Sequence, residues 1–269
     1  MKLYAIKGDK KTTYAYLFCY PKTKEFVIEL ADKADHWETP LLLSSFAQKG
    51  ILSVDPYHSK LWIQQRIVPY ERQNIGQVLK DNGLKVYDEL ALLDKSDGRC
   101  AQDDYYIEKF DYAELPRSIE NRLGKRIASS IPLGNGQYMI TFQNGRVKKC
   151  NINPFVQSKS ELSAFLNAHP DHLDKAIIAA GGSVLRWDEK LMISCAELYG
   201  SGTLIQVSAD ELKAIISSSI IDTAEACELL GYSRQYINEL VSGGKLVPLK
   251  ANEKSTLFLR NDVEKKLWE

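Results

Sequence analysis

The stretch that decides the architecture at the C-terminal end is residues 221–241, which read IDTAEACELLGYSRQYINELV. Thr223 can cap a first helix. The apolar face of that helix consists of Ala226, Leu229 and Leu230. Gly231 then permits a tight turn, because glycine adopts a positive φ without steric cost. Residues 221–231 therefore predict a short amphipathic helix that ends in a tight turn.

A second helix is expected directly after this turn. Ser233 can cap it, and the apolar side chains that anchor it recur at i, i+3 and i+4. They are Ile237, Leu240 and Val241. The opposite side is polar and carries Arg234, Gln235, Tyr236 and Asn238. These side chains can donate hydrogen bonds to phosphates or read base edges in a major groove.

Two short strands and a closing helix follow Gly243-Gly244. The strands are expected over 246–250 and 255–260, on either side of the polar tip 251–254. Residues 261–268 suit a last helix that packs Val263, Leu267 and Trp268 onto the domain.

This order of elements resembles the winged helix-turn-helix domains of the excisionase and MerR families, and the matching motif covers about a fifth of the chain. The resemblance implies that Ser233 to Asn238 enter the major groove and that the basic residues beside the wing meet phosphates. The candidate DNA-binding residues are Ser233, Arg234, Gln235, Tyr236, Asn238, Lys250, Lys254 and Arg260.

Because the chain has no net charge, any affinity for DNA must come from a local basic surface. The whole chain has 35 basic and 35 acidic residues, so no overall field draws it onto nucleic acid. Residues 221–269 hold seven Lys/Arg and eight Asp/Glu, with acids grouped on the first helix. The span from Ser233 to Arg260 has five basic and two acidic residues. We therefore expect the contact face to be basic.

A small α+β domain is expected over 136–215. Its hairpin joins 137–142 to 146–152 through Asn144-Gly145, which predicts a type I′ turn. A helix is expected over 160–168, and strands over 183–187 and 191–193. The region resembles a family of small bacterial domains of unknown function that often precede helix-turn-helix modules. The residues that carry the resemblance are 142–147, 153–155, 184–188 and 196–199. Trp187 and Tyr199 are expected in its core.

A mixed α/β domain is expected over 1–115. It starts with a hairpin, 14–20 and 25–30, and continues with helical stretches that end at Gly50, Asn82-Gly83 and Asp97-Gly98. This region resembles proteins encoded beside HipA-type kinases, without the catalytic or nucleotide-binding pattern of the kinase. The residues that carry the resemblance are 62–72, Leu79, 82–84, 87–88 and 98–104. Arg66, Arg72 and Arg99 are candidates for an anion or a protein partner, and surface salt bridges are the favoured alternative.

The fold class that follows is α+β and multidomain: a mixed domain over 1–115, a Pro/Gly-punctuated linker over 116–135, a small β-rich domain over 136–215 and a winged helix-turn-helix over 220–269. We expect no cofactor and no metal. His169 and His172 have helical ligand spacing but fall in a turn, and five scattered cysteines form no CxxC pair. Without a GxSxG elbow or a phosphate loop, the chain is not expected to be an enzyme.

The function expected from the sequence is a cytoplasmic, bacterial or phage-type transcriptional regulator, including an antitoxin-like autorepressor, that binds double-stranded DNA. Because a module of this size reads few base pairs, sequence-specific binding is expected to need a homodimer or two adjacent DNA sites. The alternative is an interaction adaptor whose helix-turn-helix has lost DNA and whose N-terminal domain holds a protein partner. No apolar run approaches the length of a membrane span.

Overall fold

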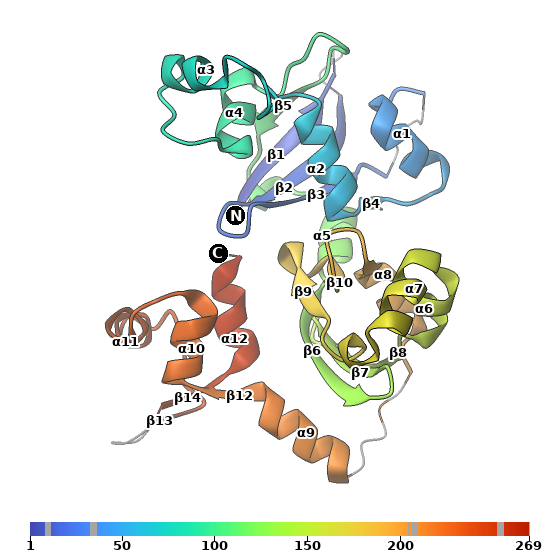
Figure 1. Ribbon diagram of the computed structural model, residues 1–269, viewed down its shortest axis with the longest axis vertical. Helices are drawn as coiled ribbons and strands as arrows, with labels where there is room; N and C mark the ends of the chain where they lie inside the picture. The colour runs from blue at the N-terminus through green and yellow to red at the C-terminus, as the bar shows by residue number, and fades with distance from the viewer. Residues whose placement is uncertain (9–11, 33–36, 204, 206–208, 252–255, 269) are drawn as a thin grey trace. The chain divides into compact units, whose positions relative to one another are not determined.

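The computed structural model describes residues 1–8, 12–32, 37–203, 205, 209–251 and 256–268. Helices and strands are mixed along the chain, with several small antiparallel sheets, which confirms the α+β class (Figure 1). The chain divides into two compact units, Met1–Arg122 and Leu123–Glu269. Each unit has its own hydrophobic core.

The first unit is built on a five-stranded antiparallel sheet of order β4-β3-β2-β1-β5. Its strands are β1 (Lys2–Lys7), β2 (Thr13–Tyr20), β3 (Glu25–Leu30), β4 (Ser53–Val54) and β5 (Tyr106–Lys109). The predicted hairpin over 14–30 is confirmed as β2 and β3, with Tyr20 opposite Glu25. Both strands are buried along almost their whole length, so neither has a solvent-exposed face.

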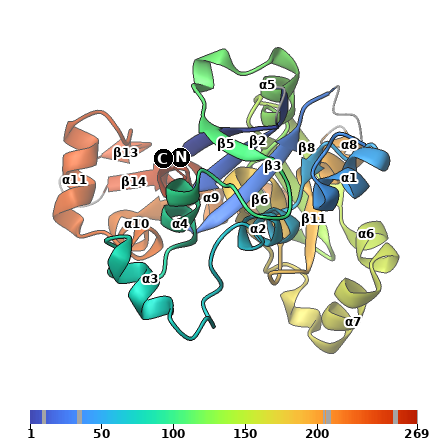
Figure 2. The same cartoon turned by 90° about the horizontal axis from the view of Figure 1, so that it is seen from above.

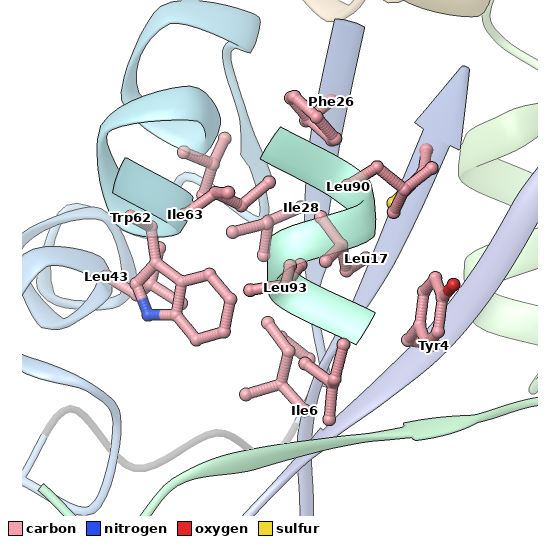
Figure 3. Packing of buried hydrophobic residues seen from close by; sticks show 14 of the residues in the cluster. Tyr4, Ile6, Leu17, Phe26, Ile28, Leu43, Trp62, Ile63, Leu90 and Leu93 are labelled. Carbon is pink, nitrogen blue, oxygen red and sulfur yellow. The ribbon is translucent and has the colours of Figure 1, made fainter. Parts of the chain in front are cut away.

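Short helices complete this unit: α1 (Leu41–Gln48), α2 (Pro56–Gln64), α3 (Ile75–Asp81), α4 (Glu89–Ser96), η1 (Tyr112–Glu114) and α5 (Arg117–Leu123). Three of them end where the sequence predicts, because Gly50, Gly83 and Gly98 all have positive φ. Figure 3 shows Trp62 of α2, Leu93 of α4 and Ile28 of β3 in the same cluster of buried side chains.

The expectation that Arg66 forms a salt bridge at the surface is wrong, because its side chain is buried. Its guanidinium is buried, lies 4.1 Å from the centroid of the Trp62 ring and forms a bidentate pair with Asp103, at 2.8 and 2.5 Å. It also donates to the carbonyl of Gly98 at 3.2 Å. A guanidinium held this way fixes the loop 98–103 against α2 and is not available to an outside anion.

The first part of the second unit contains two small antiparallel sheets, of order β6-β7-β8 and β11-β10-β9. The strands are β6 (Ile127–Gly134), β7 (Gln137–Phe142), β8 (Val147–Asn151), β9 (Ile177–Ala179), β10 (Val184–Arg186) and β11 (Met192–Ser194). The helices are α6 (Asn153–Ser158), α7 (Ser160–Ala168), η2 (Pro170–His172), η3 (Ala180–Gly182) and α8 (Cys195–Ser201). The hairpin, the helix over 160–168 and both later strands are confirmed.

The turn between β7 and β8 is not the predicted type I′. Of its residues, Gly145 has a positive φ, of 79°, whereas Asn144 does not. The N–H of Gly145 donates to the carbonyl of Phe142, and that of Phe142 to Arg146. This is the three-residue connection, a type I turn followed by one left-handed glycine, so only one of the two residues needs positive φ.

The stretch 116–135, expected as a linker from its prolines and glycines, contains helix α5 and strand β6. Pro116 immediately precedes α5, a position where a missing N–H costs nothing. Pro132 lies in β6, an edge strand in which one N–H need not be paired. Both prolines are therefore compatible with regular structure here.

The last part of the chain has helices α9 (Ala209–Ser219), α10 (Thr223–Leu230), α11 (Arg234–Ser242), α12 (Arg260–Glu264) and η4 (Lys265–Leu267). Its strands β12 (Ile220–Asp222), β13 (Lys250–Ala251) and β14 (Thr256–Leu259) form an antiparallel sheet of order β12-β14-β13. α10 and α11 lie side by side (Figure 1 and Figure 2). A core of Ile221, Ala226, Leu230, Ile237, Leu240, Leu246, Phe258 and Val263 joins the helices to the sheet.

Candidate nucleic-acid interface

Helix α10 begins one residue earlier than the sequence suggested. The cap is Asp222, whose carboxylate accepts hydrogen bonds from the backbone N–H groups of Ala224 and Glu225 at 2.7 and 2.9 Å. Thr223, the expected cap, is the first helical residue. Aspartate is an equally good N-cap, and its negative charge is favoured at the positive end of the helix dipole. Because Asp222 and Thr223 are adjacent and both can cap a helix, the sequence alone does not distinguish between them.

The connection between α10 and α11 is as tight as predicted. Gly231 adopts the left-handed conformation, with φ 67° and ψ 27°, and its N–H donates to the carbonyl of Cys227. Two residues later Ser233 caps α11, accepting from the N–H of Tyr236 at 3.2 Å. The cap occupies the Ser233 hydroxyl, so this candidate contact residue already has a structural role.

The orientation of α11 is set by Ile237 and Leu240, both buried in the core. Because residues three and four apart lie on one helix face, the opposite face points outward. It exposes Arg234, Gln235 and Asn238. Within the described residues, none of these three side chains forms a hydrogen bond or an ion pair inside the protein.

Tyr236 shares this outward face and is 43% exposed. Its ring meets that of Tyr232 edge-on, with centroids 4.8 Å apart, which restricts the orientation of the side chain. Glu239 is also exposed on α11 and brings the one carboxylate of this helix. The face is thus polar and aromatic, with one basic and one acidic group.

The candidate phosphate contacts beside the sheet differ in whether their side chains are available to DNA. Lys250 is exposed on β13, opposite Leu257 of β14. Arg260 opens α12, and its guanidinium is engaged within the protein: Nε donates to the carbonyl of Ser218 at 3.1 Å, and the group lies 3.9 Å from the Glu264 carboxylate. Lys254 lies outside the described residues.

A second group of cations was not predicted from the sequence, because its members come from separate stretches. It surrounds Tyr199 of α8 and consists of Lys125, Arg146 and Lys148. The neutral side chain of Asn144 donates a hydrogen bond to the Tyr199 hydroxyl beside them. Tyr199 was expected as a core residue; its ring does pack on Phe142, but the side chain is only half-buried. No sequence spacing brings Lys125 near Tyr199, so the group becomes visible only in the fold.

The remaining candidates form no site. His169 and His172 stack on each other with ring centroids 5.4 Å apart. Among the described residues no three His, Cys, Asp or Glu side chains are grouped as a metal would require. The five cysteines are free thiols, with Cys19, Cys150 and Cys195 buried.

Comparison of the chain with protein-family models, with curated proteins and with solved structures finds no match. No helix in the described parts of the chain combines the length and apolarity needed to cross a membrane.

Proposed function

We propose that this protein binds double-stranded DNA through a C-terminal winged helix-turn-helix module and acts as a transcriptional regulator. The observation that carries the proposal is the outward face of α11, where Arg234, Gln235 and Asn238 are exposed and have no partner within the described protein. Directional donors and acceptors left unpaired on a capped helix suit recognition of base edges in a major groove.

Each part of the module has a distinct role in the proposal. Arg234 pairs with guanine, and Asn238 or Gln235 with adenine, since these are the bidentate contacts that the side chains favour. Lys250 meets the phosphate backbone, which gives affinity without sequence information. Arg260, which binds the carbonyl of Ser218, instead fixes α12 against the end of α9.

A protein-interaction module is the second candidate. Its support is a set of exposed apolar side chains in the same region: Tyr236, Val247, Leu249 and Leu259. Val247 is 69% exposed, and Leu249, which directly precedes β13, is 52% exposed. Apolar exposure of this kind often marks a protein contact. In this case the chain would be an adaptor, and α11 would not bind DNA.

A mobility-shift titration of the full chain on the DNA upstream of its own coding sequence separates the two candidates. The test variant is Arg234→Ala/Asn238→Ala, and the control on the same helix is Glu239→Gln, which removes a charge that repels phosphate. We expect the double variant to lose the preference for this DNA over scrambled duplex, and the control to bind at least as tightly as the wild type. Equal binding of wild type and double variant to both duplexes would favour the adaptor.

A further inference from the structure

The group of cations around Tyr199 is a second surface with the chemistry of an anion site. The ring of Tyr199 packs edge-on against Phe142, with centroids 4.8 Å apart. Lys148 Nζ lies 4.4 Å from the ring centroid and Lys125 Nζ 5.5 Å from it. The ring therefore holds two ammonium groups near its π-system, which favours cations.

The hydroxyl of Tyr199 is oriented by its neighbours. Asn144 Nδ2 donates to it at 3.1 Å, and the positive charge of the Arg146 side chain acts on it as well. The bond from Asn144, followed by the charges of Arg146 and Lys148, lowers the pKa of Tyr199. Because its oxygen already accepts the hydrogen bond from Asn144, the hydroxyl proton is left to donate to an outside acceptor.

The backbone holds these side chains in place. The N–H of Asn144 donates to the carbonyl of Gly124 at 2.8 Å, and that of Gln143 to Arg126 at 2.9 Å, which ties the β7–β8 turn to the stretch that carries Lys125. The N–H groups of Gly145 and Arg146 are also used, by Phe142 and by the side chain of Asn144. All four turn N–H groups are thus occupied, so no backbone nest remains for a small anion.

The charge of this group is not neutralised within the described residues. Lys125, Arg146 and Lys148 form no ion pair with a carboxylate there, whereas the adjacent Lys149 pairs with Glu211 at 2.5 Å. Lys125 and Arg146 are exposed. Cationic side chains at the surface, without an enclosed pocket of N–H donors, are typical of contacts to a phosphodiester backbone.

We propose that Lys125, Arg146, Lys148 and the Tyr199 hydroxyl form a phosphate-binding surface that contacts the backbone of double-stranded DNA. The residues of this surface come from α8, the β7–β8 turn, strand β8 and the stretch before β6, and none of them belongs to α11. It adds affinity that does not depend on sequence, and it needs no base contact.

The test is binding of the full chain to a random-sequence duplex at several salt concentrations. The variant Lys125→Gln/Arg146→Gln changes two exposed side chains, and the control Lys175→Gln/Lys190→Gln removes the same charge elsewhere in the second unit. Each phosphate contact contributes about 0.9 to the slope of log affinity against log salt, so the variant should reduce this slope by about two. The control should leave it unchanged, and Tyr199→Phe should weaken binding without changing the slope.

The outcomes separate this inference from the function proposed for α11. If Lys125→Gln/Arg146→Gln binds the duplex like its control, the inference is wrong, whatever the α11 variants do. A salt slope lowered by this variant, together with a preference for the upstream DNA over scrambled duplex that Arg234→Ala/Asn238→Ala leaves intact, supports the inference and contradicts the role of α11. An effect confined to binding of inorganic phosphate, with equal duplex affinity in variant and control, overturns the assignment to DNA.

Discussion

Asp222 and Glu225 cap helix α10 reciprocally. The Asp222 carboxylate accepts from the N–H of Glu225 at 2.9 Å, and the Glu225 carboxylate accepts from the N–H of Asp222 at 2.9 Å. Two of the acids that make the C-terminal region formally negative are therefore engaged at the start of α10. Their charge is placed where the helix dipole favours it, so it does not define the face of α11.

Replacing Asp222 with Ala should destabilise the C-terminal helices by about 1 kcal/mol, because two backbone N–H groups lose their acceptor. Asp222→Asn keeps an acceptor oxygen and should cost less. Thr223→Ala is the matched control, since the Thr223 hydroxyl makes only a 3.5 Å contact to Thr256. Urea unfolding measures the difference in stability between these variants, and hydrogen exchange of the α10 amides locates it. A larger loss for Thr223→Ala than for Asp222→Ala would contradict the cap assignment.

Gly231→Val should destabilise the turn between α10 and α11 by roughly 1–2 kcal/mol, the cost of a left-handed conformation for a residue with a Cβ. The cost comes from the backbone, because a Cβ at this position would meet no atom within 4 Å. Gly231→Asn is the control, since asparagine tolerates this conformation. If thermal unfolding shows equal stability for both variants, the positive φ of 67° is not maintained in solution.

Lys250→Ala and Asn238→Ala should affect DNA binding in different ways. Loss of Lys250 should weaken binding to every duplex alike and reduce the salt slope by about one. Loss of Asn238 should leave the salt slope nearly unchanged. It should reduce the difference in binding free energy between target and scrambled DNA by about 1–3 kcal/mol, the value of one bidentate contact. Titrations at several salt concentrations distinguish the two effects. Identical behaviour of the two variants would contradict this division of roles.

Asp103→Ala should destabilise the first unit by about 3–5 kcal/mol, the usual cost of breaking a buried pair. The side chain of Arg66 is only 3% exposed, so its charge would stay buried without its partner. Arg72→Ala, at an exposed position of the same unit, is the control and should change stability by less than about 0.5 kcal/mol. Denaturant unfolding of the two variants makes the comparison. Similar midpoints would show that the pair is not maintained in solution.

The stability that Glu197 contributes should depend on pH. Burial raises the pKa of Glu197, but hydrogen bonds from the Ser194 hydroxyl and N–H and from Lys159 outweigh this, so the pKa is lowered. A lowered pKa means that the carboxylate stabilises the folded state above the unfolded value of about 4.3, and that this contribution is lost as pH falls below it. Glu197→Gln should therefore cost stability at pH 7 and progressively less below about pH 4. A constant cost from pH 7 to pH 3 would contradict the assignment.

Local patterns in the sequence were sufficient for most elements. The β2–β3 hairpin, helix α7 and the helices on both sides of Gly231 were predicted because apolar spacing and capping residues are local properties. The β7–β8 turn was assigned to the wrong type, since Asn-Gly suits both a two-residue and a three-residue connection. Which one forms depends on the register of Phe142 and Arg146, and dipeptide chemistry does not determine that register.

Non-local contacts were beyond the reach of the sequence. Arg66 looked like a surface residue because its partner Asp103 is 37 positions away in the sequence. Arg260 looked like a phosphate contact until the fold brought it to the carbonyl of Ser218. The cations around Tyr199 belong to the same class, because they meet only when the turn after β7 docks on residues 124–126.

The position of β5 at the edge of the first sheet sets the order in which that sheet can be completed during synthesis. β1 pairs with β2 on one side, but on the other it pairs with β5, about one hundred residues later in the chain. Until residue 109 has left the ribosome, the free edge of β1 exposes unpaired N–H and C=O groups to other nascent chains. A truncated chain that ends before Tyr106 keeps this edge open permanently. Expression of the first unit alone should therefore extend to Arg122, where the unit ends.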